Sequence, residues 1–220
     1  MRRIVRPEIL DGDHASHQEI GKSLVDLQRI NRWFGGTRTM RKLIETVLDR
    51  TNKTHLTLLD VGSATGDIPI AIEKQLASRG IQLRYTLLDR DSTHFSADVS
   101  NRVRGNALTL PFRDKSFDLI SCSLFAHHLE PDELSTFLKE SLRISRIAVL
   151  INDLRRSYLH LAAVRAGTPI FSRITRHDSV ASVRRAYTPG EMRQMLNHGT
   201  ARHIEIRNSY LFRMGIIAWK

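Results

Sequence analysis

The run Leu58-Leu-Asp-Val-Gly-Ser-Ala-Thr-Gly-Asp67 constrains this chain more than any other stretch of its sequence. A short apolar segment ends in an acidic residue, turns through two glycines and then opens a helix, which is typical of a buried parallel strand whose carboxyl end cradles a small ligand. The dinucleotide pattern G-x-G-x-x-G and the Gly-Lys-Ser/Thr of a phosphate loop are both absent from it. Because Asp60 and no basic residue ends the strand, we expect a cationic or neutral nucleoside rather than a nucleotide held by its phosphates.

Alternating strand and helix patterns extend from this loop in both directions. Helical spacing of apolar residues covers 16–50, with a break at Gly35-Gly36, and the remaining predicted helices are 68–79, 131–144, 154–166 and 189–197. Predicted strands are 56–61, 83–88, 103–107, 117–123 and 146–151, followed by 204–207 and 211–219, which are too close together for a helical crossover. The pattern predicts an α/β fold, a doubly wound, Rossmann-like seven-stranded sheet with an antiparallel C-terminal hairpin and a helical N-terminal extension.

The order of elements contains no repeat or linker, so residues 1–220 are predicted to form one domain. Two parts are exceptions to the regular alternation. Residues 90–101 are too short and polar for a full crossover helix, and the arginine-rich stretch that ends at Tyr187 is expected to be irregular.

Cysteine content and the length of the apolar runs indicate in which cell compartment the protein is expected. The single Cys122 excludes an internal disulfide and a cysteine metal cluster, and the longest aliphatic run, Ile147–Ile151, is far too short to span a bilayer. The charged residues 1–7 have no apolar segment behind them, so they are not a secretory signal. These features predict a cytoplasmic protein.

Charge is distributed unevenly along the chain. Residues 143–220 hold 14 Lys and Arg against 4 Asp and Glu, whereas residues 1–142 hold 20 against 19. Of the 34 basic residues 27 are arginine, the side chain suited to bidentate contacts with carboxylates and phosphates. The C-terminal third is therefore interpreted either as a solvated face or as a surface that meets an acidic substrate, carrier or membrane.

Three motifs together resemble the class I S-adenosylmethionine (SAM)-dependent methyltransferases, in particular their small-molecule and quinone-biosynthesis branch. They are the loop 59–67, the strand end Leu88-Asp89, and the run Gly105-Asn-Ala-Leu-Thr-Leu-Pro-Phe-Arg-Asp-Lys-Ser-Phe-Asp-Leu-Ile120, which continues into Ser123-Leu-Phe-Ala-His-His-Leu129. The resemblance covers residues 55–151 and implies SAM as methyl donor and S-adenosylhomocysteine (SAH) as product. The donor-binding residues it implies are Asp60, Gly62, Ser63, Ala64, Gly66, Asp89, Arg90, Asn106, Ala107 and Ser123.

The resemblance implies a role for some of these positions, and at others the residue differs from the one that the family usually has. By resemblance, Asp89 accepts both ribose hydroxyls, and Asn106 stands where the family commonly has an aspartate that reads the adenine amino group. The amide oxygen of Asn106 is still an acceptor for that amine. Ala64 replaces the middle glycine of the usual loop, and the missing crossover helix alters the adenine-side wall.

The acceptor side is predicted from residues that follow the fourth and fifth strands. His127 and His128 are candidate bases, and Asp153 is predicted to fix the pocket or a substrate hydroxyl, although packing roles and helix capping remain open for these residues. The expected acceptor pocket lies between a helical N-terminal lid at 1–54 and an insertion at 155–187, and its candidate substrate contacts are Trp33, Phe34, Arg155, Arg156 and Tyr187. No metal site is expected, because adjacent histidines do not easily share one ion and no acidic residue has ligand spacing.

The predicted activity is methyl transfer from SAM to a small molecule, with a phenolic, quinone-like or polyketide acceptor and O-methylation favoured over C-methylation. An acidic or carrier-bound acceptor would account for the C-terminal arginines. Two alternatives stay open, a nucleic-acid methyltransferase and a SAM-binding protein without turnover. Against the first, the fourth strand leads into Ser123-Leu-Phe-Ala and not into the Asn/Asp-Pro-Pro-Tyr motif used on exocyclic amines.

Overall fold

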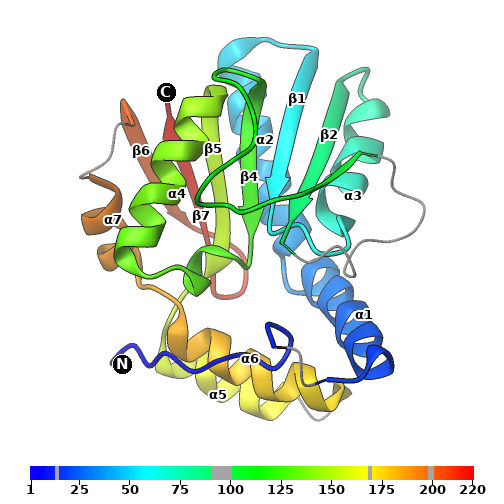
Figure 1. The fold of residues 1–220 in the computed structure, drawn as a ribbon, viewed down its shortest axis with the longest axis vertical. Coiled ribbons are helices and arrows are strands. Elements are labelled where there is room, and N and C mark those ends of the chain that lie inside the picture. The colour runs from blue at the N-terminus through cyan, green and yellow to red at the C-terminus, as the bar shows by residue number, and fades with distance from the viewer. Residues whose placement is uncertain (13–14, 91–100, 168–169, 198–200) are drawn as a thin grey trace.

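A seven-stranded sheet forms the centre of the computed structural model, which describes residues 1–12, 15–90, 101–167, 170–197 and 201–220 (Figure 1). The strand order is β3-β2-β1-β4-β5-β7-β6. Neighbours among β1 to β5 pair in parallel, whereas β7 runs antiparallel to both β5 and β6. The strands are β1 His55–Val61, β2 Gln82–Asp89, β3 Arg102–Arg104, β4 Phe117–Ser123, β5 Ser145–Leu154, β6 His203–Asn208 and β7 Arg213–Trp219.

Helices cover both faces of this sheet, as the alternating pattern predicts. The helices α2 (Gly36–Thr51) and α3 (Asp67–Ala77) share one apolar cluster with β1 and β2, whereas α4 (Pro131–Ile144) and α7 (Pro189–Asn197) share another with β4, β5 and β7. Strand β1 contributes to both clusters, since Leu58 belongs to the first and Leu59 to the second. Burial on both faces explains why the apolar residues of β1 do not simply alternate with polar ones.

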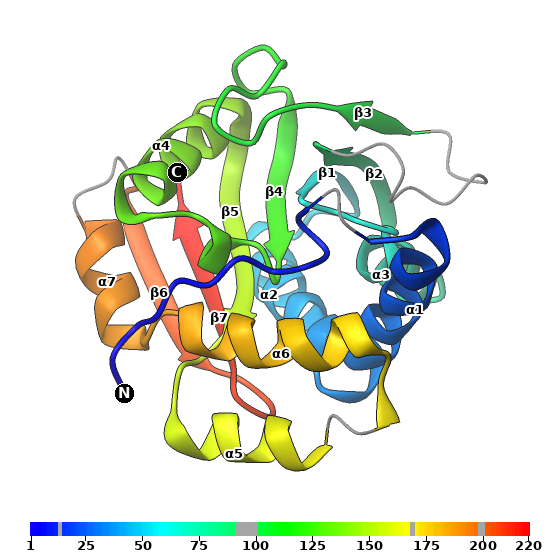
Figure 2. The same ribbon diagram turned by 60° about the horizontal axis from the view of Figure 1, so that its bottom comes forward.

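Three further helices form a third layer at the carboxyl ends of the parallel strands. They are α1 (His17–Trp33), α5 (Tyr158–Gly167) and α6 (Arg173–Arg185), and α6 lies against both α1 and α5 (Figures 1 and 2). The short 3-10 helix η2 (Ala126–His128), which follows β4, also contacts α6. The carboxyl ends of β1, β2, β4 and β5 face this layer, and residues of the strand ends and of the three helices line one cavity (Figure 1).

Local sequence signals account for the ends of α1. Ser16 caps its first turn in a reciprocal capping box with Glu19, and the helix stops before Gly35, whose φ of +80° suits a residue without a side chain. The predicted break between the first two helices is therefore confirmed. The hairpin of β6 and β7 confirms the predicted antiparallel ending.

Helix α6 corrects the expectation of an irregular segment before Tyr187. Residues 173–185 form a regular helix that Ser172 caps through a bond from the Thr175 N–H. Its buried positions recur at helical spacing but include polar side chains, so the stretch lacks the apolar periodicity by which helices are recognised. The expected lack of a crossover helix concerns mainly residues 91–100, which lie outside the described residues.

Residues 1–12, the N-terminal strap, cross the third layer beside α6 (Figure 2). The Ile4 N–H donates to the Arg184 carbonyl at 3.1 Å, and the N–H groups of Ile9 and Leu10 donate to the Asp178 carboxylate at 2.8 and 3.0 Å. These contacts hold the strap over the carboxyl ends of β4 and β5. Within the described residues, no helix is both long and apolar enough to cross a bilayer.

Candidate functional site

The glycine loop after β1 folds back onto the end of β2. The N–H groups of Gly62 and Ser63 both donate to the Leu88 carbonyl, at 2.9 and 3.2 Å. Gly62, Ala64 and Gly66 have left-handed φ values of +65°, +45° and +71°. A Cβ on Gly66 would lie 2.3 Å from Cδ1 of the fully buried Leu87. The glycine therefore permits the close approach of α3 to β2 that the sequence predicts.

Asp89 stands beside this loop at the carboxyl end of β2. Its Oδ2 accepts a hydrogen bond of 2.9 Å from the Ala64 N–H, and its carbonyl accepts one of 3.0 Å from the Gly105 N–H. The predicted donor residues on three segments, the loop, the end of β2 and the stretch at Asn106, are thus brought together. Asn106 itself is exposed, and its Oδ1 accepts from the Leu108 N–H at 2.9 Å.

A buried acid lies under the loop. Asp60 is 3% exposed and its Oδ1 accepts from the Ser121 hydroxyl at 2.5 Å. Burial, opposed by that hydrogen bond and reinforced by the carboxylates of Asp67 and Asp89, raises the pKa of Asp60 to about 7. A cationic ligand above the loop would favour the ionised form of this carboxyl group.

Arg213 at the start of β7 is a pocket residue that the sequence reasoning missed. It is 1% exposed, its Nη2 donates to Asn31 Oδ1 at 3.4 Å, and its Nη1 has no hydrogen-bond partner among the described residues. Burial lowers its pKa to about 10, against the opposing charges of Asp153 and Asp67. Asn31 also donates to Asp67 at 3.2 Å, so α1, α3 and β7 meet in one polar network.

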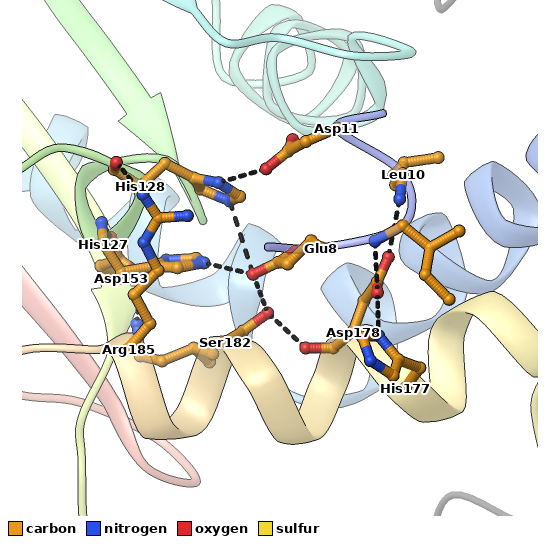
Figure 3. A network of polar contacts seen from close by, with 12 residues as sticks. Glu8, Leu10, Asp11, His127, His128, Asp153, His177, Asp178, Ser182 and Arg185 are labelled. Atoms are coloured by element: carbon orange, nitrogen blue, oxygen red, sulfur yellow. Dashed lines mark hydrogen bonds and ion pairs between the residues drawn. The ribbon is translucent and has the colours of Figure 1, made fainter. Parts of the chain in front are cut away.

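A buried histidine–aspartate pair occupies the other end of the site (Figure 3). His127 Nδ1 lies 2.7 Å from Asp153 Oδ1, and the His127 N–H donates to Asp153 Oδ2 at 2.8 Å. Burial alone would lower the pKa of His127, but the carboxylates of Asp153 and Glu8 raise it to about 10. The contacts with His127 correspondingly hold the pKa of Asp153 below its ordinary value despite burial.

Glu8 of the N-terminal strap faces both histidines. Its Oε1 lies 3.4 Å from His127 Nε2 and 3.8 Å from His128 Nε2, and the Ser182 hydroxyl of α6 lies 2.7 Å from the same oxygen. Burial would raise the pKa of Glu8, but the two histidines and Ser182 lower it overall. Nothing in the N-terminal sequence marks Glu8 as a site residue, because the strap has no helical or strand periodicity.

The second histidine is held from both sides. His128 Nδ1 lies 2.9 Å from Asp11 Oδ2 in the strap, and Arg185 of α6 donates to the His128 carbonyl. The strap, η2 and α6 therefore meet at one cluster, which Figure 3 shows from close by.

A single cavity of about 1310 Å³ connects the glycine loop with this cluster. The predicted donor residues that line it are Asp60, Gly62, Ser63, Ala64, Asp89, Arg90, Asn106, Ala107 and Ser123, and both predicted histidines line it as well. Gly66 and Asp153 stand behind this wall, where they shape the loop and fix His127. A volume of this size suits a nucleoside donor together with a second small molecule.

The predicted substrate contacts divide into two groups. Phe34 lines the cavity, whereas Trp33 is 55% exposed and is not part of the wall formed by the described residues. Arg155 does not line it either, and its N–H donates to the Phe212 carbonyl.

The other two predicted contacts serve as internal braces. Arg156 is buried and binds the carbonyls of Met1 and Ala186 and the Glu191 carboxylate, at 2.9, 2.6 and 2.5 Å. Tyr187 is also buried, and its hydroxyl donates to the Leu129 carbonyl at 2.7 Å. Both side chains anchor the segments around the pocket.

Comparison with known proteins agrees with the Rossmann-like methyltransferase fold that the sequence predicts. Residues 59–148 match the family model described as a methyltransferase domain, and the sequence matches no curated protein. The plantazolicin methyltransferase BpumL in complex with SAH aligns with a TM-score of 0.71 at 14% identity, over 96% of this chain and 92% of that one. A SAM-dependent methyltransferase from Aquifex aeolicus aligns with a TM-score of 0.62 at 15% identity, over 89% and 97%.

Proposed function

Since this chain is a class I SAM-dependent methyltransferase, we propose that it methylates an oxygen atom of a small molecule, with a phenolic, quinone-like or polyketide acceptor. SAM is the cofactor and SAH the product. One observation carries the proposal: a single cavity joins the glycine loop to a polar cluster that contains two histidines. We further propose that the reaction takes place in the cytoplasm and belongs to secondary metabolism.

The donor half of the cavity is assigned by its acidic lining. The Asp89 carboxylate beside the loop is suited to accept the two ribose hydroxyls in charge-assisted hydrogen bonds. Asp60 beneath the loop faces the region proposed for the methionine part, where the sulfonium and ammonium groups of SAM carry positive charge. The loop carries no lysine or arginine, which agrees with a donor that has no phosphate.

The acceptor half is assigned by the histidine cluster. The bond from Nδ1 to Asp153 fixes the ring of His127, so Asp153 acts as a positioning residue, and we propose that His127 and His128 engage the acceptor oxygen. In the reaction, a lone pair of that oxygen forms the new C–O bond while the S–CH3 bond breaks and its electron pair stays on sulfur. The hydroxyl proton passes to one of these two histidines as the sulfonium becomes the neutral thioether of SAH.

The nature of the acceptor is supported by the shape and size of the pocket. Helices α1, α5 and α6 contribute walls around the cluster, and the enclosed space is large enough for a donor and an aromatic acceptor. Among proteins of similar fold, BpumL has been seen with a pentazolic desmethylPZN analog and SAH, at a TM-score of 0.68 and 14% identity over 93% of this chain. The cavity of this chain is large enough for SAM and a small acceptor together, which supports the proposed phenolic, quinone-like or polyketide acceptor.

Basic charge favours one alternative, a nucleic-acid methyltransferase. The chain has a formal net charge of +11, which would attract a polyanion. However, the described part of the pocket is covered by the strap and α6, so a duplex would have to present a flipped base through that cover.

Titration with SAH followed by transfer of labelled methyl groups tests the proposal. We expect SAH to bind in isothermal titration calorimetry, and label to pass from SAM to phenols, reduced quinones or hydroxylated polyketides. The acceptor variant His128→Ala is expected to lose most transfer while it keeps SAH binding. The proposal would be overturned by label that enters bulk RNA and no small molecule, or by a chain that does not bind SAH.

A further inference from the structure

The ring nitrogens of His127 and His128 are arranged in the same way. In each ring Nδ1 faces a carboxylate, Asp153 at 2.7 Å for His127 and Asp11 at 2.9 Å for His128. In each ring the remaining nitrogen, Nε2, then faces Oε1 of Glu8, at 3.4 and 3.8 Å (Figure 3). Two imidazoles and one carboxylate thus point their outer atoms at a common centre.

The spacing of these three atoms suits an ion better than a direct contact. His127 Nε2 is buried and forms no hydrogen bond with any described residue, although Glu8 lies close by. The ligand atoms of Glu8, His127 and His128 all lie within 4.8 Å of one another. Metal–ligand bonds of about 2.0–2.2 Å place the ligand atoms of one ion roughly 3–4 Å apart. Small shifts of the side chains would therefore complete a coordination sphere.

We propose that Glu8, His127 and His128 bind one divalent transition-metal ion, with Zn²⁺ as the reference ion. Two imidazoles and a carboxylate are a known ligand set for zinc that leaves a position open. Asp153 and Asp11 would fix the tautomers of the two histidines, as carboxylates do behind histidine ligands of metals. The charge also agrees, because the three carboxylates around the two imidazoles attract a divalent cation. Imidazoles coordinate an ion in their neutral form, so ion binding releases any proton that their Nε2 atoms carry.

This site differs from the sequence expectation that no metal binds. Adjacent histidines do not easily share one ion, since on a regular helix or strand their side chains point apart. In η2 the two rings instead lie 4.3 Å apart between centroids, at an angle of 37°. The missing acidic ligand comes from Glu8 in the strap, far from the histidines in sequence.

A bound ion would join two parts of the molecule. It would tie the strap to η2 beside α6, and its open position would lie toward the cavity that all three ligands line. An acceptor hydroxyl bound there would lose its proton more readily, because a divalent ion lowers the pKa of a bound oxygen. This role in transfer rests on the proposed function, whereas ion binding itself does not.

The test uses the full chain after removal of metal with a chelator. Zinc is titrated by calorimetry, and Co²⁺ is added as a visible-absorption probe. We expect one Zn²⁺ per chain and d–d bands typical of nitrogen and oxygen coordination. The variants Glu8→Gln and His128→Ala are expected to weaken zinc binding by about 10-fold or more, since each removes one ligand. The control His203→Ala changes an exposed histidine of β6 and is expected to bind zinc like the unchanged chain.

Each outcome decides the proposal. Absence of stoichiometric binding, or unchanged binding in both ligand variants, would overturn it. SAH titration of the same samples checks that every variant is folded, so a variant that loses zinc but keeps SAH supports the site. If zinc binds but no acceptor is methylated, the acceptor assignment is wrong and the metal site stands. If methylation proceeds equally after chelation, the ion has no role in transfer.

Discussion

The two halves of the pocket are built in different ways. The donor half is built on neighbouring strand ends, where N–H groups of the loop 62–66 donate to the Leu88 carbonyl and to the Asp89 carboxylate of β2. The acceptor half is assembled from the strap, η2, β5 and α6, which are far apart in sequence and are joined by side chains. The donor half depends on local backbone geometry, and the acceptor half on the complete tertiary fold.

Buried acids show the same contrast. Among the described residues, Asp60 in the donor half has no basic side chain as a hydrogen-bond partner, and burial raises its pKa to about 7. Asp153 in the acceptor half is equally buried, but His127 holds its pKa below the ordinary value. A cationic ligand would therefore favour the ionised form of the donor-half carboxyl, whereas in the acceptor half an imidazole of the chain itself already does so.

The largest effect is expected at Gly66. Gly66→Ala would place a Cβ against buried Leu87 in addition to straining a φ of +71°. The left-handed conformation costs about 1–2 kcal/mol, and overpacking adds about 1–3 kcal/mol. We expect urea unfolding to report the sum, together with loss of SAH binding.

Gly80→Ala is the matched control for this change. Its φ of +73° is nearly the same, but a Cβ there meets no atom of the described residues within 4 Å. It is expected to cost only the backbone term and to leave SAH affinity unchanged. Equal losses in both variants would show that close packing of α3 on β2 is not what the loop requires.

Asp89→Ala should produce the next largest effect. Loss of charge-assisted hydrogen bonds to the ribose is expected to weaken SAM binding by about 10- to 100-fold, at about 1.5–3 kcal/mol per bond to a charged group. Asp89→Asn retains the shape and one acceptor oxygen, so its loss should be smaller. Calorimetric Kd values measure both, and an unchanged Kd for Asp89→Ala would remove the ribose assignment.

Asp153→Asn tests the acceptor half alone. The amide no longer holds His127 as a carboxylate does, so we expect turnover to fall by about 10- to 100-fold, the range seen for such supporting partners. Because Asp153 stands behind the pocket wall, the Kd of SAH should change by less than a factor of about two. A parallel loss of SAH affinity would mean that the two halves are not independent.

The smallest effect concerns the pH dependence of stability. Asp60 has a folded pKa of about 7 against 3.8 when exposed, so the folded chain binds a proton more tightly than the unfolded chain. Stability contributed by the protonated form is present below about pH 4 and is lost as the pH rises toward 7. Asp60→Asn should remove this dependence and stabilise the ligand-free chain by about 1–3 kcal/mol at pH 8. Urea unfolding between pH 5 and pH 8 measures it, and a constant difference between the two chains would contradict the shifted pKa.

Sequence patterns predicted the parts of the molecule in which neighbouring residues act together. The glycine loop, the strand ends, the helix break at Gly35 and the C-terminal hairpin all follow from turn chemistry or apolar spacing. The sequence does not predict helix α6, because its inner face carries Thr175, Asp178 and Ser182 where a core helix would carry apolar side chains. That polar face is also what supports the acceptor half.

The residues that sequence reasoning missed are those placed by long-range contacts. Glu8 lies in a strap without secondary structure, and Arg213 is a basic residue in a β-hairpin, where an exposed position is the ordinary expectation. Arg156 and Tyr187 show the converse, since their residue types suggested substrate contacts and their surroundings make them braces. Partners distant in sequence decide these roles, and a single sequence does not reveal them.

A crystal structure of the chain with SAH tests the central claim most directly, namely that one cavity holds the donor at the glycine loop and the acceptor at the histidine cluster. We predict that the ribose hydroxyls bind the Asp89 carboxylate and that the SAH sulfur faces His127 and His128 across open space for an acceptor. A sulfur atom that points away from the histidines, or a ribose that does not contact Asp89, would contradict the account.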